Sequence, residues 1–373
     1  MSSATLVPQQ ARPHRGLPAL DTGGRAIAFF EFWPQWAFYT PMVLYWVYLS
    51  IRHGGATLPT VSNPSFPFGG WIGESKDAVL RQAGPFSRTL IAPFISFVRG
   101  DDPSVSAAGA IRQLRNAGLR FPVVAKPDMG CRGVGVRRVR NENDLVQYIA
   151  GFPAGERIIL QALVDHEAEA GVFYVRRPGE ARGQIISLTL KYFPYVYGDG
   201  HSTLAELIAR DRRAGPLKHL YLARHVHRCN DVLADGQPYR IAFAGSHSRG
   251  TIFRDGNAFI TDAMTEAFDA VAKDIDGFFF GRFDVRFTTL DDLRMGRGFT
   301  ILECNGAGAE ATHIWDRRTT LREAYRTLIQ QYALLWEIGA ENARRGAAPA
   351  RFRDLFRAWR NEVRLWAKYP PTE

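Results

Sequence analysis

The sequence has few cysteines, and they do not cluster. Cys131, Cys229 and Cys304 are widely separated in a chain of 373 residues, and no two of them form a CxxC pair. This spacing excludes a disulfide-stabilised scaffold and a cysteine-rich zinc site, and it favours a reducing compartment. We therefore expect a cytoplasmic protein of two or three domains that is stabilised by an apolar core.

Several familiar functional signatures are also missing. The chain contains no GxxxxGK[ST], GxGxxG or GxSxG motif, so a P-loop, a dinucleotide fingerprint and a nucleophile elbow are not indicated. Residues 1–24 lack the apolar run and the cleavage site of a secretory signal. Because they are polar and rich in proline and glycine, we expect them to form a flexible tail.

Positive charge is in excess, with a net charge of +10. Such a balance favours an anionic partner, which could be a nucleotide, a nucleic acid or an acidic membrane surface. We expect no nucleic-acid partner, because the excess is mostly arginine spread along the chain and no recognition motif accompanies it. The hydrophobic fraction of 46% excludes global disorder.

An unusually aromatic segment, AIAFFEFWPQWAFYTPMVLYWVYLSI, covers residues 26–51. Its only charge is Glu31, and Pro34 and Pro41 interrupt it. It is long enough to cross a bilayer, which needs about 20 residues, but its aromatic residues are not confined to the two ends. We favour a buried helix or a homodimer contact. Residence in the membrane interface and a membrane span are the alternatives.

Residues 351–368 predict a basic amphipathic helix. Its apolar residues recur at helical spacing, with basic residues between them. We favour a surface helix packed on the domain over one that docks on a membrane. The apolar positions are Phe352, Leu355, Phe356, Trp359, Val363 and Trp366, and the basic ones are Arg351, Arg353, Arg357, Arg360, Arg364 and Lys368.

Short strand and helix patterns alternate through the rest of the chain, many of them hairpin-like. This mixture predicts an α+β or α/β fold with antiparallel sheets. Asn141 is a candidate helix N-cap, and Gly118 a candidate helix end. The predicted strands cover 121–126, 134–139, 157–163, 170–176, 184–190, 238–244, 278–287 and 298–304, and the main predicted helices cover 107–117, 142–150, 203–213, 263–276 and 321–339.

The run VVAKPDMGCRGVGV (residues 123–136) places a glycine-rich loop between two strands. Gly130, Gly133 and Gly135 would let backbone N–H groups approach a polyphosphate closely. Lys126, at the end of the first strand, could place its ammonium group on a phosphate. A purely structural glycine hairpin is the alternative.

Two further segments, GRFDVR (residues 281–286) and TILECNG (residues 300–306), read as neighbouring strands. Residues two apart share a face, so Arg282, Asp284 and Arg286 point one way, and Glu303 and Asn305 share a face of the other strand. Two carboxylates and an amide oxygen are ligands suited to Mg²⁺. A solvated ladder of salt bridges is the alternative. Lys191, at the end of another apolar strand, is either a second phosphate contact or an ordinary strand-end charge.

This ordered set of a lysine, a glycine loop, a second lysine, RxD and ExN resembles the ATP-grasp superfamily. The resemblance is greatest to carboxylate–amine ligases of the D-alanine–D-alanine ligase-like and cyanophycin-synthetase-like groups, and it extends over residues 74–315. It implies two α+β subdomains that hold ATP between them, with Mg²⁺, or alternatively Mn²⁺, as the cofactor ion.

The resemblance also implies roles for individual residues. Lys76 and Lys126 would bind nucleotide phosphates under the Gly130–Gly135 loop, and Lys191 would contact the γ-phosphate. The hinge of Gln161 to Val164, including Leu163, would hold adenine, although the family usually has an acidic residue at the position of Gln161. Glu169 would bind ribose, with Asp165 and Glu167 as competing candidates.

For the chemical step, the resemblance implies that Arg282 steadies the acyl phosphate and that Asp284, Glu303 and Asn305 hold the metal. The GDGHSTLAELI segment and GSHSRG (residues 245–250) fall where that family contacts its substrate. The substrate candidates are His201, Ser202, Arg240, His247 and Arg249.

These interpretations define the expected domain organisation. A flexible tail (1–24) precedes an atypical aromatic N-terminal region (25–105). Two ATP-grasp subdomains follow, the first with the glycine loop and hinge (106–183) and the second with the metal and substrate side (184–340). The basic C-terminal helix (341–373) is the last part.

We therefore expect an ADP-forming ligase that joins a small-molecule or amphiphilic carboxylate to an amine through an acyl phosphate. A small-molecule kinase and a degenerate nucleotide-binding protein at the membrane surface are the alternative functions. The expected location is cytoplasmic, with peripheral contact on the inner face of the membrane as an open question.

Overall fold

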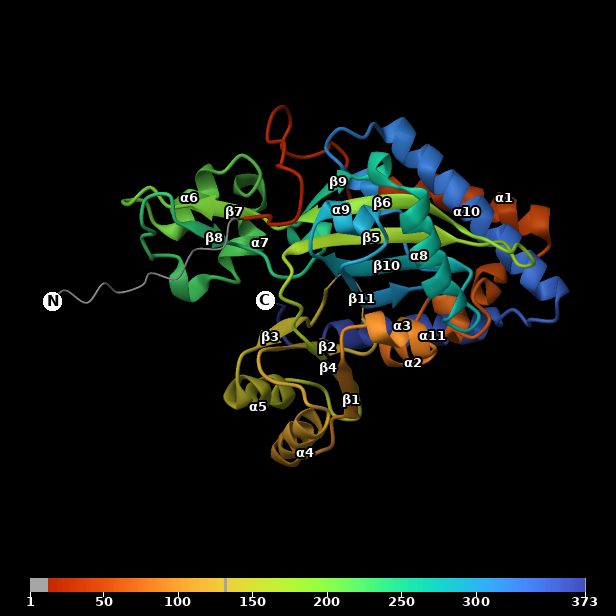
Figure 1. Cartoon of the computed structure of the whole chain (residues 1–373), viewed down its shortest axis with the longest axis horizontal. Helices are drawn as coiled ribbons and strands as arrows, with labels where there is room; N and C mark the ends of the chain where they lie inside the picture. The colour runs from red at the N-terminus through yellow and green to blue at the C-terminus, as the bar shows by residue number, and fades with distance from the viewer. Residues whose placement is uncertain (1–12, 131–132, 373) are drawn as a thin grey trace.

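Two antiparallel sheets form the framework of the protein (Figure 1). The computed structural model describes residues 13–130 and 133–372. Mixed helices and antiparallel sheets confirm the predicted α+β class. Short 3₁₀ turns join the larger elements: η1 (Leu58–Val61), η2 (Pro67–Gly70), η3 (Gly215–Leu217), η4 (Val226–Arg228), η5 (His247–Arg249), η6 (Asn257–Phe259) and η7 (Thr312–Trp315).

The first sheet has four strands in the order β1-β4-β2-β3. Two helices, α4 (Pro103–Asn116) and α5 (Glu142–Ala150), pack on it and bury one apolar core. Both predicted helix ends near this sheet are confirmed: Asn141 accepts a hydrogen bond from the Asp144 N–H (2.9 Å), and Gly118 has a φ of +68°. The strands are β1 (Phe94–Val98), β2 (Val123–Pro127), β3 (Arg137–Val139) and β4 (Arg157–Ala162).

The second sheet has five strands in the order β11-β10-β5-β6-β9. Alternate residues of β5 enter two different cores, because successive side chains of a strand point to opposite faces. Val172 and Tyr174 pack with Phe268 of α8 (Asp262–Lys273), whereas Phe173 and Val175 pack with Trp336 of α10 (Leu321–Arg344). The strands are β5 (Ala168–Val175), β6 (Gln184–Tyr192), β9 (Ile252–Asp255), β10 (Phe280–Phe287) and β11 (Phe299–Asn305).

Helices cover both faces of the second sheet. On one face lie α2 (Lys76–Arg81), α3 (Pro85–Leu90), α8 (Asp262–Lys273) and α9 (Leu290–Arg294). The other face is covered by α10 (Leu321–Arg344), which begins with a capping box of Thr320 and Glu323. Helix α1 (Gln35–His53) packs on the outer side of α10 (Figure 1). The last helix is α11 (Phe352–Trp366).

A small lobe, shown in green in Figure 1, projects from the second sheet. It has its own apolar core and a two-stranded sheet. Its elements are β7 (Tyr195–Tyr197), α6 (Leu204–Arg210), α7 (Lys218–Leu222) and β8 (Pro238–Arg240).

The structure differs from the expected domain boundaries at two places. β5 lies inside the range 106–183 assigned to the first subdomain, yet it pairs with β6 and β10 of the second sheet. The chain therefore crosses between the sheets just before β5. The predicted tail also differs: residues 1–12 lie outside the described part, but Leu17 and Leu20 pack against the core of the second sheet.

The aromatic segment is partly buried and partly exposed. Phe38, Met42 and Leu49 of α1 face the protein, whereas Trp36, Leu44 and Ile51, among others, are exposed. In residues 13–130 and 133–372, no helix combines the length and the apolar character that a bilayer crossing requires. The favoured interpretation of this segment as a packed helix fits the observed packing, although α1 keeps a large apolar surface exposed.

A buried ion pair connects the aromatic segment to the small lobe, and it generates a stability prediction. Glu31 Oε1 lies 2.6 Å from Arg213 Nη2, and Glu31 is only 4% exposed. Replacing Glu31 with Ala would leave the guanidinium of Arg213 buried without its carboxylate. We expect a loss of about 3 kcal/mol in the free energy of unfolding, measured by urea denaturation. Glu142→Ala, which removes an exposed partner of Arg115, should cost less than about 1 kcal/mol. Equal losses for the two variants would contradict the prediction.

Candidate functional site

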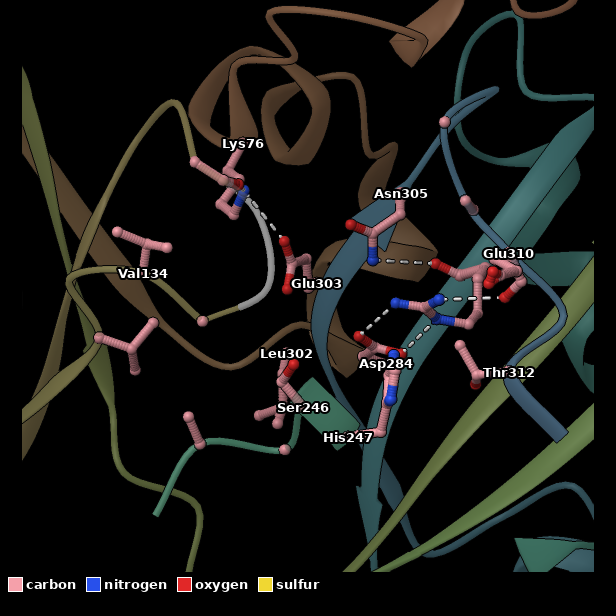
Figure 2. Close-up of a pocket in the computed structure, with 18 of the residues that line it drawn as sticks. Lys76, Val134, Ser246, His247, Asp284, Leu302, Glu303, Asn305, Glu310 and Thr312 are labelled. Atoms are coloured by element: carbon pink, nitrogen blue, oxygen red, sulfur yellow. Dashed lines mark hydrogen bonds and ion pairs between the residues drawn. The ribbon is translucent and has the colours of Figure 1, made fainter. Parts of the chain in front are cut away.

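A cavity of about 620 Å³ lies between the two sheets. Its walls receive side chains from β2 and β4 of the first sheet and from β5, β6, β10 and β11 of the second. Figure 2 shows the region around Asp284 and Glu303. Most residues singled out in the sequence line this cavity: Lys76, Lys126, Gly130, Gly133, Gln161, Leu163, Glu169, Lys191, His247, Arg282, Asp284, Glu303 and Asn305.

The pairing of β10 with β11 places the acidic side chains together. Asp284 is paired with Glu303, and Arg282 with Asn305. Asp284 is also bound by two cations, since Lys191 Nζ lies 3.1 Å from Oδ1 and Arg282 Nε lies 2.8 Å from it. Burial alone would raise the pKa of the Asp284 carboxyl, but Arg282 and Lys191 outweigh it and lower that pKa.

Glu303 is neutralised by Lys76, whose Nζ lies 3.1 Å from Oε1. Lys76 belongs to the first turn of α2, where Ser75 is the N-cap, and its ammonium also donates to Gly130 O at 2.6 Å. Burial opposes the charged form of Lys76, but the nearby Glu303 and Glu74 carboxylates raise its pKa overall. Lys76 therefore connects the glycine loop to the acidic pair.

Lys126 lacks such a direct carboxylate contact. Its ammonium donates to Gln161 Oε1 (2.8 Å) and to Leu302 O (3.1 Å). Burial lowers the pKa of Lys126 to about 8. The amide of Gln161 thus provides a neutral partner for this lysine.

Among the three acidic candidates after the hinge, only Glu169 lines the cavity. It accepts from Lys191 Nζ at 3.0 Å and lies 3.6 Å from Arg286 Nε. Asp165 is exposed, and Glu167 accepts a hydrogen bond from the Tyr195 hydroxyl. This placement favours Glu169 for a role at the site.

The glycine loop borders the cavity through Gly130 and Gly133, whereas Gly135 is not part of the lining. Gly135 has a φ of +72°, and a Cβ built there would lie 2.7 Å from Pro127 Cγ. Thr372 contacts the same loop: its hydroxyl donates to Gly133 O (2.8 Å) and accepts from Gly135 N (3.1 Å). Cys131 lies outside the described residues.

Four of the five substrate candidates do not line the cavity. His201 is exposed on the turn before α6, where its backbone N–H donates to Asp199 Oδ1. Ser202 donates to the same carboxylate, so both residues stabilise the turn of the small lobe. Arg240 is held by the Ala242 and Phe243 carbonyl oxygens, and Arg249 lies beyond the lining. His247 alone reaches the cavity, and it stacks on Trp315.

Some residues in the cavity lining or beside it were not among the sequence candidates. Glu74 precedes Lys76 in GESK and accepts a hydrogen bond from Gly306 N (2.8 Å); burial raises its pKa to about 8. Arg286, the last residue of GRFDVR, donates to Val164 O in the hinge (2.6 Å). Alternation along residues 281–286 predicted that Arg286 shares the face of Asp284, and Arg286 lines the cavity, but no role at the site was assigned to it from the sequence. Glu310 and the aromatic side chains near it have no periodic pattern in the sequence that would have pointed to the site.

The donor set fits a hard divalent cation. Asp284, Glu303 and Asn305 supply carboxylate and amide oxygens from adjacent strand positions, which is the chemistry that Mg²⁺ prefers. In the described part of the chain, no group of three or more His, Cys, Asp or Glu side chains has metal-site geometry. A magnesium site would therefore depend on the amide of Asn305 and on oxygens of a bound ligand.

The cavity thus lies between two antiparallel sheets, with Lys126 supplied by the first sheet and with Lys191, Asp284 and Glu303 supplied by the second. No protein-family model matches the sequence, and no curated protein matches it either. Among solved structures, the chain is similar to a bifunctional glutathione synthetase from Pasteurella multocida, with 16% identity and a TM-score of 0.34. The alignment covers 68% of this chain and 36% of that one.

Two further solved structures are similar. VanG D-Ala:D-Ser ligase from Enterococcus faecalis is 13% identical, with a TM-score of 0.37 and coverage of 70% of this chain and 62% of that one. D-alanine–D-alanine ligase from Bacillus anthracis is 10% identical, with a TM-score of 0.38 and coverage of 76% and 72%. The chain thus spans less than two thirds of the first two proteins, and no functional residue is transferred from any of the three.

The lowered pKa of Lys126 predicts a pH-dependent affinity for nucleotide. Below about pH 8 the ammonium is protonated and attracts phosphate, and above it the charge is lost. Glu74 ionises over the same range and adds negative charge near the site, so both changes act in one direction. We expect the affinity for ADP, measured by calorimetry, to fall roughly tenfold between about pH 7.5 and pH 9.5.

Two variants separate the contributions of these groups. Lys126→Met should bind ADP more weakly at the lower pH and lose most of the pH dependence. Glu74→Gln should remove the remaining part of the pH dependence, because the glutamine side chain cannot ionise. An unchanged pH profile in Lys126→Met would show that this lysine does not meet the nucleotide.

Proposed function

We propose that the chain is an ATP-grasp carboxylate–amine ligase that releases ADP and phosphate. The observation that supports this most directly is the convergence of Lys126, Lys191, Asp284, Glu303 and Asn305 on one cavity between two sheets. Lysines from both sheets, with two carboxylates beside them, are suited to a triphosphate and a divalent cation, which carry complementary charges.

The reaction would proceed in two steps. A carboxylate is a poor electrophile, because attack on it would have to expel oxide. Transfer of the γ-phosphoryl group of ATP to the carboxylate gives an acyl phosphate, which has a good leaving group. An amine then attacks the acyl carbon, and the amide and phosphate are released.

The charged residues of the cavity would stabilise the transferring group. Lys126 and Lys191 would neutralise phosphate oxygens, and Arg282 would stabilise the oxyanion that develops at the acyl carbon. Asp284, Glu303 and Asn305 would hold Mg²⁺, or alternatively Mn²⁺, whose charge favours phosphoryl transfer. When ATP binds, Lys191 would exchange its contacts with Glu169 and Asp284 for contacts with phosphate oxygens, and Lys76 would do the same with its contact to Glu303.

Two other functions are compatible with the same nucleotide site. A small-molecule kinase would stop after phosphoryl transfer to a hydroxyl, and it would give ADP and a stable phosphorylated product without any amine. A degenerate nucleotide-binding protein would keep its biological activity after Asp284→Asn and Glu303→Gln. The ligase is favoured because Arg282 lies beside the acidic pair, where an acyl phosphate would need a cation.

The ligase function can be tested by screening ADP release over pooled carboxylates and amines, with mass spectrometry of the products. We expect ADP release that requires both a carboxylate and an amine, and an amide product. Hydroxylamine should replace the amine and yield a hydroxamate from the acyl phosphate. A phosphorylated alcohol as the only product would favour the kinase instead.

The double variant Lys126→Ala, Asp284→Ala should lower ADP release by at least about 100-fold, because it removes charge from both sides of the triphosphate. The single variant Asp284→Asn, which keeps the side-chain shape, should lose most of the rate as well. Lys218→Ala with Asp291→Ala removes the same two charges at exposed positions and should have no effect. Circular dichroism checks that each variant is folded. ADP release at the wild-type rate in the double variant would count against the site.

Peripheral contact with an anionic membrane is a second proposal, and it rests on exposed side chains. On α11, Phe352, Phe356 and Trp359 are exposed between exposed arginines, while Leu355 and Leu365 face the protein. Apolar side chains would enter the interface, and arginines would contact lipid phosphates.

Cosedimentation with vesicles tests this membrane contact. Full-length protein should bind vesicles that contain phosphatidylglycerol and should bind purely zwitterionic vesicles less. The variant Phe356→Ser, Trp359→Ser should bind at least about tenfold more weakly, because two buried apolar groups are lost. If the wild-type protein stays in the supernatant, the membrane proposal fails. In that case, a concentration-dependent dimer in sedimentation velocity would assign the exposed apolar surface to a homodimer contact.

A further inference from the structure

The outer face of α1 is a part of the aromatic segment that neither the core nor the cavity uses. Helix α1 lies on the outer side of α10 (Figure 1), and its residues Phe38, Met42 and Leu49 are buried there. On the opposite side of the helix, apolar residues three and four apart share one exposed face. These residues are Trp36, Val43, Leu44, Val47, Tyr48 and Ile51, and none of them lines the cavity.

This face is large for a monomeric protein, which rarely exposes an apolar patch of more than a few hundred Å². Trp36 and Ile51, near its two ends, are 76% and 78% exposed, and Leu44, at its middle, is 68% exposed. Because a buried aromatic side chain covers about 150–250 Å², the face and the aromatic residues just before it expose on the order of 1,000 Å². A stable interface needs about 800 Å² from each partner, so the outer face is large enough for one. The exposed aromatic residues before the helix are Phe29, Phe32 and Trp33.

The polar groups on the outer face already take part in hydrogen bonds within the helix. The Thr40 hydroxyl donates to Trp36 O (2.5 Å). The Tyr48 hydroxyl accepts from Arg52 Nη1 (3.1 Å). Burial of a polar group costs most when it loses its hydrogen bonds to water and gains none in return. The outer face can therefore be covered by an apolar partner at little polar cost.

Charge distinguishes the outer face of α1 from the exposed face of α11. The sequence from Phe32 to Ile51 contains no charged residue, whereas the exposed apolar residues of α11 alternate with exposed arginines. A helix that docks on an anionic membrane needs such cations beside its apolar side chains. Two copies of a chain with a net charge of +10 repel each other over most of their surface, so they can meet best through an uncharged face. A second copy of this chain offers that face.

We propose that the chain forms a homodimer in which the outer faces of α1 from two copies pack against each other in an antiparallel arrangement. A two-fold axis between the copies lets one surface serve both partners. The spacing of three and four residues along the face suits packing against another helix. Arg52 and His53 follow the face at one end only, so an antiparallel pair keeps the basic ends apart and brings opposite ends of the helix dipoles together. Leu44 then lies near the two-fold axis. The proposal does not depend on the ligase function.

Sedimentation velocity of the full-length protein without detergent, from about 0.1 to about 100 µM, tests the dimer. We expect the sedimentation coefficient to rise with concentration from the value of a monomer to that of a dimer. Leu44→Glu should weaken dimerisation at least about 100-fold, because the carboxylates of the two copies would face each other at the centre of the interface. Val105→Glu on α4 is the matched control, since Val105 is 66% exposed, and it should dimerise like the wild type. Circular dichroism checks that both variants are folded.

Disulfide formation tests how the two helices are arranged. Leu44→Cys should form a disulfide between copies under mild oxidation, because the two copies of residue 44 lie close to the axis. Ile51→Cys should not, although Ile51 is the more exposed residue, because its two copies would lie roughly 20 Å apart along an antiparallel pair. The wild type carries the same native cysteines and gives the background. A disulfide in Ile51→Cys but not in Leu44→Cys would overturn the antiparallel dimer.

Other results would overturn the proposal and assign the outer face differently. A wild type that stays monomeric over the whole range, or that dimerises no better than Leu44→Glu, excludes this interface. If the monomeric wild type binds purely zwitterionic vesicles and Leu44→Glu does not, the face is a lipid contact. If the dimer is lost in Phe356→Ser, Trp359→Ser but kept in Leu44→Glu, the interface lies on α11 instead.

Discussion

The pairing of β10 with β11 is the constraint on which the site depends. It places Asp284 opposite Glu303, and two like charges at adjacent strand positions are tolerated only because Lys191, Arg282 and Lys76 surround them. Those cations come from β6, from β10 itself and from α2, so one electrostatic requirement ties three parts of the chain together. The same charges then provide what a triphosphate and a divalent ion would need.

Much of this arrangement was predictable, because strand periodicity is a local property. Alternation along residues 281–286 and 300–306 correctly placed Asp284, Glu303 and Asn305 on one surface, and the strand and helix patterns gave the α+β class. The assignment of β5 to a sheet was not predictable in this way, since pairing partners depend on the path of the chain and not on composition. Glu74 and Glu310 escaped notice for the same reason: a single carboxylate in a loop has no periodicity, and only the fold shows what surrounds it.

The substrate candidates of the small lobe illustrate the limit of motif transfer. In the GDGHSTLAELI segment, the capping box of Thr203 and Glu206 starts α6, and Asp199 organises the preceding turn. These are local roles, which account for the motif without any contact to the cavity. The unusual aromatic segment, in contrast, is at the site, where Tyr39 reaches the cavity from α1.

The hydroxyl of Thr372 bridges Gly133 and Gly135, while Tyr369 stacks on Phe152 below α5. The glycine loop is thereby fastened to the peptide that follows α11. A displacement of Gly133 and Gly135 would therefore either move this peptide as well or break the two hydrogen bonds of Thr372. The border of the cavity and the segment after α11 are mechanically coupled, so a contact that shifts α11 would also be transmitted to the cavity.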